Sequence, residues 1–577
     1  MILVFGGTTE GRRAAEVLEE AGSPFFYSTK TGEQDLALQH GRHIDGAMDA
    51  DAMTAFVHAH EIRLMVDAAH PFASQLHQTI ASVAADCQIP CIRFERIYPP
   101  RDADLTWIDD YRQVPVDIRT LLATTGVQSI SKLKYLEAQG VKVYYRILHR
   151  ASSMALALKQ GASEEQLCYY DNPKDIPVEA DAILLKESGL SGGFAEKVAA
   201  ARLRGMRIIV LKRPPIETGI SVNGPYGLRR AVEKLLPAFY PLHSGLTTGT
   251  CATAAAIAAT LRLLGEETPQ EVPVVLPDGE TIHVPVSYGD GYASCFKEAG
   301  DDPDVTNGLE IRASVRTADT FEIHGGEGVG VFTLPGFDYP PGEPAINKAP
   351  REMIRHNISL LSTVNGPLSI TISVPQGAEI ARRTFNPRLG IEGGISIIGV
   401  SGIVKPFSEE AFIESIRKCM MVAKAAGSER VVINSGGKSE RFVKALYPDL
   451  PQQSFVEYGN YIGETLKMAG ELGFRQVTLG VMLGKAVKLA QGHLDTHSRK
   501  AVMDKGFIRQ MLDEAHCDID ISDITLAREI WERLPEESCK AFAQTIIRHC
   551  ANHCEPLLPD GSLTILLIDD QGNIYPQ

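Results

Sequence analysis

Short apolar runs alternate with helix-length amphipathic segments over residues 1–242. This alternation is typical of repeated strand–helix units and of parallel sheets. A helix is predicted at Ala195–Arg204. Strands are predicted at Met1–Phe5, Pro24–Thr29, Arg63–Asp67, Gln128–Ser131, Val141–Arg146, Ala182–Lys186 and Arg207–Arg213.

The pattern changes near residue 243, where His243–Cys251 leads into an alanine-rich helix. Alternating apolar positions in Val272–Val286 predict a β-hairpin around Pro277–Asp–Gly279. Later segments predict an α+β part over about 243–394 and an α/β domain over about 395–577. The predicted strands of that domain are Ile395–Val400, Arg430–Asn434 and Gln476–Gly480, and its predicted helices are Ser408–Ala426 and Tyr458–Leu472.

Prolines mark the join between the two patterns. Pro214, Pro215 and the segment Pro237–Pro241 interrupt regular structure just before residue 243. The chain of 577 residues also exceeds what one hydrophobic core usually organises. We therefore predict separate folding units at 1–242 and 243–577, as in two enzymes joined end to end.

Composition is that of an ordinary globular protein, with 44% hydrophobic and 22% charged residues. The net charge of −15 argues against a nucleic-acid partner but leaves room for a locally basic pocket. No apolar run reaches the roughly 18 residues of a membrane span. Because Met1–Phe5 begins directly as a strand, we expect no secretory leader and a cytoplasmic location.

The ten cysteines are expected to be reduced thiols. His549–Cys550–Ala–Asn–His553–Cys554 offers four donors, but no second ligand pair stands at a zinc-binding spacing. We interpret this cluster as a helix end and predict no metal site.

A glycine-rich loop follows the first predicted strand. Gly6, Gly7, Thr8, Thr9 and Gly11 are candidate cofactor-binding residues, because such loops let backbone N–H groups approach a pyrophosphate. Thr8 replaces the second glycine of the dinucleotide fingerprint, so a plain tight turn remains an alternative. After the second strand, Lys30, Glu33 and Asp35 leave NADH and NADPH equally open.

His70 follows the strand Arg63–Asp67, at the end where open α/β sheets bind ligands. It is the acid–base or substrate-orienting candidate of this half, with a helix-capping histidine as the alternative. The strand Ala182–Lys186 likewise leads into a glycine-rich loop, Glu187–Gly193.

Five segments together resemble the precorrin-6A reductase family of corrin biosynthesis: Gly6–Gly11, Asp67–Ala73, Thr124–Gly126, Lys186–Gly189 and Lys212–Pro214. The resemblance implies two Rossmann-like lobes, about 1–120 and 121–242, with NADH or NADPH between them and hydride delivery to the macrocycle. It also makes Thr125 and Gly126 cofactor candidates. Lys186, Ser188 and Arg213 become candidates for cofactor phosphate or substrate carboxylates, with solvated loop residues as the alternative.

Seven segments of the second half carry a further resemblance: His243–Ala259, Lys297–Val305, Gly325–Gly330, Gly342–Arg351, Thr384–Gly394, Val404–Glu410 and Lys488–Ser498. Together they resemble the cobalt-precorrin-5B C1-methyltransferase family of the anaerobic cobalamin route. The resemblance implies methyl transfer from S-adenosylmethionine to a cobalt-bearing tetrapyrrole. Ser435, Gly436 and Gly437 follow a predicted strand as a cofactor-sized loop.

Candidate catalytic residues of this half are His493, Asp495 and His497, with local structure as the alternative. Thr247 and Thr248 are expected to line the site. Substrate carboxylates are expected to meet cations in the motif-rich loops, although surface ion pairs would explain some of these as well. The cations are Lys348, Arg351, Arg382, Arg383, Arg388 and Lys405.

Two familiar motifs are incomplete. Gly480–Lys485 is one residue short of a P-loop, and Ala486 replaces its hydroxyl residue. His493–His497 lacks the glutamate of a zinc-protease helix and follows Gly492, so zinc is not expected.

The sequence therefore predicts a bifunctional corrin-pathway enzyme, with cobalt-tetrapyrrole substrates and no nucleic-acid or membrane partner. One active half joined to a tetrapyrrole-binding scaffold is the alternative. A short-chain dehydrogenase fused to a nucleotide-binding domain is disfavoured, because no Tyr-x-x-x-Lys pair lies in the expected region. Oligomeric state, including a homo-oligomer, stays open.

Overall fold

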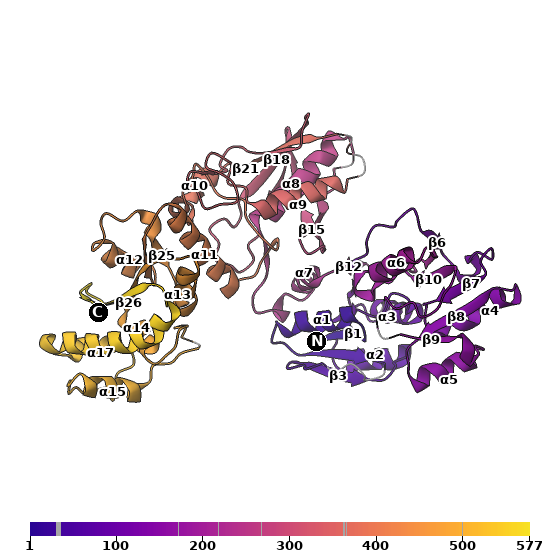
Figure 1. Cartoon of the computed structure of the whole chain (residues 1–577), viewed down its shortest axis with the longest axis horizontal. Coiled ribbons are helices and arrows are strands. Elements are labelled where there is room, and N and C mark those ends of the chain that lie inside the picture. The colour runs from indigo at the N-terminus through magenta and orange to yellow at the C-terminus, as the bar shows by residue number, and fades with distance from the viewer. Residues whose placement is uncertain are drawn as a thin grey trace. The chain divides into compact units, whose positions relative to one another are not determined.

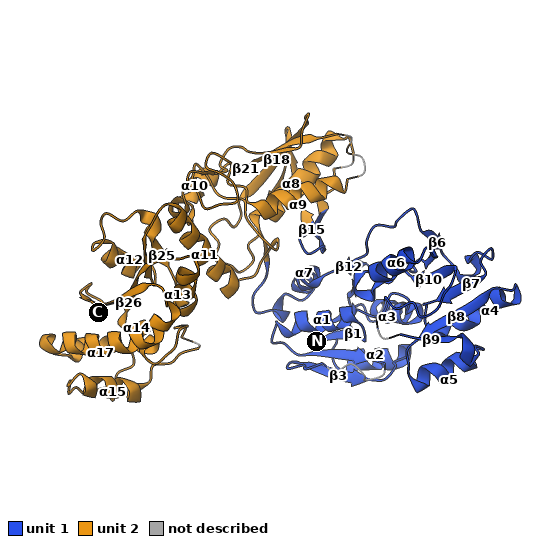
Figure 2. Ribbon diagram, viewed as in Figure 1, with its two compact units in different colours: residues 1–244, 273–283 blue, residues 245–272, 284–577 orange. Residues whose placement is uncertain are grey.

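A computed structural model gives the fold of the chain. It describes every residue except 31–35, 171, 173, 217–218, 267, 362–363, 365, 499 and 577. The chain forms two compact units (Figures 1 and 2): unit 1 comprises residues 1–244 and 273–283, and unit 2 comprises 245–272 and 284–577. Within the described part of the chain, no helix combines the length and apolar character needed to cross a membrane.

The first sheet of unit 1 is parallel and buried on both faces. Ile2 and Val4 pack with α1 (Thr9–Glu19) and α7 (Pro225–Leu235), whereas Leu3 and Phe5 pack with α2 (Ala50–Ala59) and α3 (Ser74–Asp86). This division follows from the alternation of side chains along a strand. The strand order is β12 (Ile220–Val222), β5 (Cys91–Phe94), β4 (Leu64–Asp67), β1 (Ile2–Phe5), β2 (Phe25–Thr29) and β3 (Gly41–Asp45).

A second parallel sheet follows in unit 1. Leu121 and Leu184 pack with α4 (Ile130–Ala138), and the neighbouring Leu122 and Leu185 pack on the opposite face with α6 (Phe194–Leu203). The short helix α5 (Ala151–Lys159) buries Ala157 in the same cluster as α4. The strand order is β6 (Thr106–Ile108), β11 (Arg207–Leu211), β10 (Ala182–Lys186), β7 (Thr120–Ala123), β8 (Lys142–Ile147) and β9 (Leu167–Tyr169).

The predicted strand Ala182–Lys186 is confirmed, whereas the one at Gln128–Ser131 is wrong. Residues Val127–Ser129 form a 3-10 turn that leads directly into α4. Ile130 begins a helical stripe with Leu133 and Leu136, and a strand cannot bury that spacing on one face. The strand of this region is β7, which ends just before Thr124.

The predicted hairpin is confirmed as β14 (Glu271–Val275) and β15 (Thr281–Pro285). Its tip, within residues 273–283, is part of unit 1. There the buried Glu280 carboxylate accepts hydrogen bonds from the Tyr226 N–H, at 3.1 Å, and from the Gly227 N–H. Burial raises the pKa of Glu280 to about 7 even though these two bonds favour its charged form.

Unit 2 begins with a largely antiparallel sheet. Helix α8 (Thr248–Leu263) lies against β17 (Tyr292–Phe296), β18 (Glu310–Thr317) and α9 (Lys348–Ser359), and its buried alanines allow a close approach. The strand β19 is the parallel edge strand. The order is β16 (Ser287–Gly289), β17 (Tyr292–Phe296), β18 (Glu310–Thr317), β21 (Leu368–Ser373) and β19 (Glu322–Gly325).

Glycine-rich loops connect this sheet to the remainder of unit 2. Short pairs join β13 (Gly245–Leu246) to β23 (Ile403–Val404) and β20 (Val331–Phe332) to β22 (Ile391–Glu392). The predicted strand at Ile395–Val400 is wrong. Only isolated bridges form at Ile395 and Ile397, and Gly399 has a φ of +133°, which interrupts extended backbone.

A second sheet of unit 2 has four parallel strands and one antiparallel edge strand. The predicted strand Arg430–Asn434 is confirmed as β24, and the predicted helix at Tyr458–Leu472 begins later, at Ile462. The strand order is β25 (Phe455–Glu457), β24 (Arg430–Asn434), β26 (Gln476–Met482), β27 (Ser562–Ile568) and β28 (Ile574–Pro576). The helices of this part are α11 (Glu409–Ala425), α12 (Gly437–Lys444), α13 (Ile462–Glu471), α14 (Leu483–Ala490), α15 (Lys505–Glu514), α16 (Arg528–Arg533) and α17 (Glu536–Cys554).

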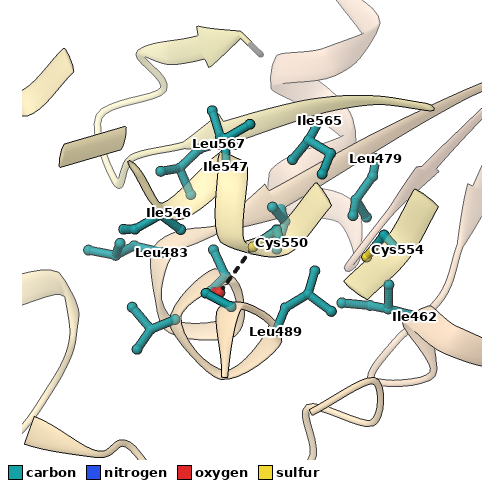
Figure 3. Packing of buried hydrophobic residues seen from close by; sticks show 14 of the residues in the cluster. Ile462, Leu479, Leu483, Leu489, Ile546, Ile547, Cys550, Cys554, Ile565 and Leu567 are labelled. Carbon is teal, nitrogen blue, oxygen red and sulfur yellow. Dashed lines mark hydrogen bonds between the residues drawn. The ribbon is translucent and has the colours of Figure 1, made fainter. Parts of the chain in front are cut away.

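The cysteines of α17 belong to the core of this domain (Figure 3). Cys550 and Cys554 are fully buried, and the Cys550 thiol donates to the Ala486 carbonyl at 3.3 Å. His549 Nε2 instead lies 2.8 Å from a carboxylate oxygen of Glu514. The possible metal ligands of His549–Cys554 therefore lie in different surroundings at the end of α17. Among the residues that the structure describes, no group of three or more His, Cys, Asp or Glu could hold a metal ion.

We predict that Gly328→Ala lowers the free energy of unfolding of unit 2 by more than about 3 kcal/mol, the range of severe packing and backbone defects. Gly328 has a φ of +70°, and a Cβ there would lie 1.8 Å from the Val374 carbonyl oxygen. The matched control is Gly342→Ala, where φ is +96° but a Cβ meets nothing within 4 Å. Backbone strain alone should cost about 1–2 kcal/mol there. If urea denaturation shows the same loss of unfolding free energy for Gly328→Ala and Gly342→Ala, the packing argument is contradicted.

Candidate functional site

The glycine-rich loop after β1 brings three elements close together. A Cβ on Gly6 would lie 2.1 Å from the Tyr27 ring, and a Cβ on Gly11 would lie 2.6 Å from the Gly6 Cα. Gly7 has a φ of +84° and open space around its Cα. Thr8 caps α1, which starts at Thr9, by accepting the Gly11 N–H at 2.9 Å. The five predicted residues thus form one compact turn at the carboxyl edge of the sheet.

A buried ionic network supports the neighbouring loop after β4. Asp67 lies 2.6 Å from His77 Nδ1 and 3.0 Å from Arg93 Nη1. Arg93 also donates to the Ala69 carbonyl, and His77 Nε2 lies 3.0 Å from the His70 carbonyl. Opposite charges and backbone acceptors satisfy all three buried groups, so the network fixes the backbone that carries His70. The sequence prediction missed this network.

His70 itself is a neutral imidazole. The residue is exposed at the surface, but neighbouring protein atoms desolvate its ring. This desolvation, with the positive charges of Arg96 and Lys186, lowers the pKa of His70 to about 3. Its Nδ1 accepts the Phe72 N–H at 3.2 Å, which assigns the ring proton to Nε2. His70 can therefore donate a hydrogen bond but cannot serve as an imidazolium acid near neutral pH.

The loop after β10 carries the other predicted contacts of unit 1. Lys186 lies 4.8 Å from the Phe72 ring, and burial with the charge of Lys132 lowers the pKa of Lys186 to about 8. Ser188 donates to the Gly192 carbonyl within its own loop. Lys186 is thus placed to meet a ligand, whereas the Ser188 hydroxyl has an internal partner.

Arg213 is also engaged internally. It lies 3.0 Å from the buried Glu187, which pairs at the same time with Arg101. The Arg213 guanidinium stacks 3.6 Å from the Tyr98 ring centre. These contacts give Arg213 a structural explanation; its predicted substrate contact stays a prediction.

Arg96 links the carboxyl edges of the two sheets. Its Nε donates to Glu10 at 2.9 Å, and its Nη1 donates to the Ser188 carbonyl at 2.7 Å. Ser191 donates to the same Glu10 carboxylate. Because Glu10 lies in the first turn of α1, the glycine-rich loop and the loop after β10 are held together.

The remaining cofactor candidates of unit 1 lie on both sheets. Thr125 is buried, with its hydroxyl 2.6 Å from that of Ser129, and Gly126 has a φ of +86°. Lys30 is exposed after β2. Glu33 and Asp35 lie outside the described residues, so the choice between NADH and NADPH stays open.

In unit 2, Thr247 and Thr248 are buried at the start of α8. The Thr247 hydroxyl accepts the Thr250 N–H at 3.2 Å, and the Thr248 hydroxyl accepts the Ile398 N–H at 2.8 Å. Both hydroxyls therefore serve the helix cap and the adjoining loop. Their predicted contact with substrate stays a prediction without geometric support.

The loop Lys297–Val305 lies in the same part of unit 2, near the start of α8. Lys297 is buried and forms an ion pair with Asp304 at 2.5 Å. Asp302 accepts the Phe407 N–H at 3.2 Å, and Phe407 has a φ of +54°, which is unusual for a bulky residue. Three segments that are distant in sequence thus converge at the start of α8.

A second candidate site lies at the carboxyl edge of the parallel sheet of unit 2. In the order β25–β24–β26–β27, the connections leave β24 and β26 in opposite directions, and ligands bind at such a switch point. The loop Ser435–Gly436–Gly437 follows β24 there. The Asn434 side chain accepts the Gly436 N–H at 3.1 Å, and a Cβ on Gly437 would meet nothing within 4 Å.

Glu457 ends β25 beside this loop. One of its oxygens would lie 3.3 Å from a Cβ on Gly436. Burial raises the pKa of Glu457, although the charges of Arg388 and Lys485 oppose the shift. In the described part of the chain, no residue hydrogen-bonds to this carboxylate. The sequence prediction missed Glu457, although an acidic residue ending the strand after a glycine-rich βα loop is a recognisable signal.

Asp495 lies beside the start of α13. It forms an ion pair with Lys500 at 2.9 Å and accepts the His497 N–H at 3.0 Å. Tyr461 and Asp495 form an isolated bridge, and His493 is exposed. The segment is not helical, so the histidines lack the geometry of a zinc-protease helix. Their acid–base role stays a prediction.

The predicted substrate cations of unit 2 have different surroundings. Lys348 is exposed and lies 3.9 Å from Glu352. Arg351 donates to the Ile346 carbonyl and lines a groove of about 450 Å³. Arg388 lies 2.7 Å from Glu440 near the edge of the parallel sheet. Arg382, Arg383 and Lys405 are exposed.

Comparisons with known proteins divide the chain in two. A family model described as "Precorrin-6x reductase CbiJ/CobK" matches residues 1–233. The CbiD model matches 238–406, and the model of the CbiD C-terminal domain matches 495–577.

Similar proteins follow the same division. The "Cobalt-precorrin-5B C(1)-methyltransferase" of Prosthecochloris aestuarii is 41% identical over 57% of this chain and 94% of its own length. A crystal structure of the cobalamin biosynthesis protein CbiD from Archaeoglobus fulgidus is 31% identical, covering 45% of this chain and 84% of that one, with a TM-score of 0.27. A structure named "CobK precorrin-6A reductase" is 18% identical, covering 41% of this chain and 96% of that one, with a TM-score of 0.34.

We predict that His70 shows no titration between pH 5 and pH 8. Since its pKa is about 3, the imidazole stays neutral throughout that range. Histidine-selective ¹³C labelling should give a ring resonance for His70 with a constant chemical shift, assigned by its loss in His70→Gln. A midpoint near pH 6.5, the value of an unperturbed histidine, would contradict the crowded environment described above.

Proposed function

Because the chain belongs to the CbiJ/CobK reductase family over residues 1–233 and to the CbiD family over residues 238–406 and 495–577, we propose a bifunctional enzyme of cobalamin biosynthesis. Unit 2 methylates C1 of cobalt-precorrin-5B, and unit 1 reduces the resulting cobalt-precorrin-6A. The observation that carries the proposal is the 41% identity across 94% of a curated methyltransferase. Both substrates are cobalt tetrapyrroles with many carboxylates.

The residues of unit 1 suit a nicotinamide dinucleotide. The close backbone approaches at Gly6 and Gly11, with open space at Gly7, are what a pyrophosphate at the start of α1 requires. Thr125 and Gly126 occupy the corresponding edge of the second sheet, and we propose that the two sheets are Rossmann-like lobes. A bound nicotinamide supplies the hydride. NADH and NADPH remain equal candidates.

His70 and Lys186 would position the substrate of unit 1. The neutral His70 donates through Nε2, which suits a carbonyl or carboxylate oxygen of the macrocycle. Lys186 supplies a partly buried positive charge for a carboxylate. Neither side chain needs to change its protonation for these contacts, so both orient the substrate and leave the redox chemistry to the cofactor.

The edge between β24 and β26 suits S-adenosylmethionine. The open space at the Gly436–Gly437 loop lets the ligand approach the protein backbone closely. Glu457 can accept hydrogen bonds from the ribose hydroxyls, as the acidic residue at the end of the second strand does in dinucleotide-binding folds. A bound S-adenosylmethionine supplies the methyl group. The chain's contribution is to align donor and acceptor, which can account for a large part of a rate enhancement.

The remaining site residues of unit 2 are proposed to handle the macrocycle. Arg388 and Arg351 would hold its carboxylates, and Lys348 would add charge at the rim. His493, Asp495 and His497 would serve as acid–base groups. Thr247 and Thr248 would act indirectly, by fixing the loop at Ile398 that borders α8.

We predict that the purified full chain transfers labelled methyl from S-adenosylmethionine to cobalt-precorrin-5B and then consumes NADH or NADPH. Lys186→Met should lower only the reductase activity, by about tenfold for one lost charged contact. Point variants are preferable to a cut near residue 242, since the cut would remove Glu280 and the rest of 273–283 from unit 1. If the full chain lacks one of the two activities while the other is intact, the alternative of one active half joined to a tetrapyrrole-binding scaffold is favoured.

We predict that Glu457→Gln weakens S-adenosylhomocysteine binding by about 10- to 100-fold, because charge-assisted hydrogen bonds contribute about 1.5–3 kcal/mol. Isothermal titration of the full chain measures the effect. The control is Glu464→Gln, which removes an exposed carboxylate paired with Lys467 on α13. The donor site is misplaced if both variants bind S-adenosylhomocysteine as the parent chain does.

A further inference from the structure

Lys197 occupies an electrostatically unfavourable position in unit 1. It lies near the start of α6, where the helix dipole and free N–H groups disfavour a positive charge. Its Nζ nevertheless folds back toward that end and donates to the Gly192 carbonyl at 2.9 Å. The helix therefore carries a lysine where an anion is normally stabilised.

Arg96 flanks the same glycine. A Cβ on Gly192 would lie 2.8 Å from Arg96 Nη1, so Arg96 and Lys197 approach Gly192 from different elements. Lys197 is half-buried, and this burial, with the positive charges of Arg146 and Arg96, lowers the pKa of Lys197 to about 8. The loop 188–193 is thus bordered by more than one cation.

Negative charge compensates only part of this cluster. Glu10 balances Arg96 at 2.9 Å. Across the residues that the structure describes, no carboxylate forms an ion pair with Lys197 or with Lys186 at the start of the same loop. Both lysines are half-buried, and taking a charge out of water is costly unless an opposite charge or hydrogen-bond acceptors compensate it. The arrangement is therefore that of a site whose counter-charge comes from a ligand.

We propose that Lys197, Arg96 and residues 188–193 form an anion site in unit 1 that binds one oxyanion group of a ligand. The group is a carboxylate of the macrocycle or a phosphate of the dinucleotide, since both present the same oxygen acceptors to a lysine and an arginine. The identity of these ligands rests on the reductase function proposed for unit 1. The site itself rests on the geometry around Gly192.

The first test measures thermal unfolding of the full chain with inorganic phosphate. Without a ligand, Lys197→Met should raise the Tm of unit 1 by about 2 °C, because it removes an uncompensated charge. With phosphate, the parent chain and Lys197→Arg should gain more than Lys197→Met. The general stabilising effect of phosphate is common to all variants and cancels in this comparison.

The control is Lys159→Met, which removes an exposed lysine from α5 in the same half of unit 1. It should respond to phosphate as the parent chain does. A structural lysine would behave in the opposite way to Lys197: its loss would lower the Tm and leave the phosphate response unchanged. That pair of results would overturn the proposal.

The second test identifies the ligand group by fluorescence titration of the full chain. The probes are NADPH, NADH and uroporphyrin, a stable tetrapyrrole with eight carboxylates. A tenfold loss confined to uroporphyrin in Lys197→Met assigns the site to substrate carboxylates; a loss for NADPH or NADH assigns it to phosphate. If the parent chain binds none of the three, the proposed reductase function fails, while the phosphate experiment still decides whether the anion site exists.

Discussion

The buried ion pair between Arg96 and Glu10 is the interaction on which the organisation of unit 1 depends. Each sheet directs its strand ends to one edge, but nothing in strand geometry brings two such edges together. Arg96 does so by binding Glu10 on one side and the Ser188 carbonyl on the other. Removing either charge would leave its partner buried without compensation, which typically costs 3–5 kcal/mol. The same contacts fix the loop that carries Lys186 and Gly192.

Unit 2 reaches an equivalent result through backbone approach instead of charge. Gly328, Gly377 and Gly394 pack so tightly that a Cβ on Gly377 or Gly394 would lie within about 2.1 Å of the Gly328 carbonyl. Threonine hydroxyls at the start of α8 fasten a further loop. Loops held in this way cannot rearrange freely, so the polar segments around α8 are preorganised. The parallel sheet adds a separate site, whose position follows from strand order alone.

The sequence predicted elements best where burial alone determines them. Ala182–Leu185 and Val431–Ile433 are continuous apolar runs because both faces of a parallel strand are covered. Gln128–Ser131 failed because its single apolar residue, Ile130, carries no period that separates a strand from a helix start. The glycine-rich loops and His70 were selected as candidates because they directly follow strands. Glu457 was missed although it ends the strand after a glycine-rich βα loop, a pattern visible in the sequence. Lys197 was missed because its significance depends on a spatial neighbour, Arg96, that no local pattern reveals.

A chain with net charge −15 that handles polycarboxylates needs concentrated local positive charge. Unit 1 obtains it by partly burying Lys186 and Lys197, where each contact with a carboxylate is stronger than at the surface. Burial also lowers the pKa of both lysines to about 8. Near neutral pH both remain mostly protonated, so the unit stays cationic where anions bind. As pH rises through about 8 the lysines lose their charge, and affinity for anions should fall although the fold is unchanged.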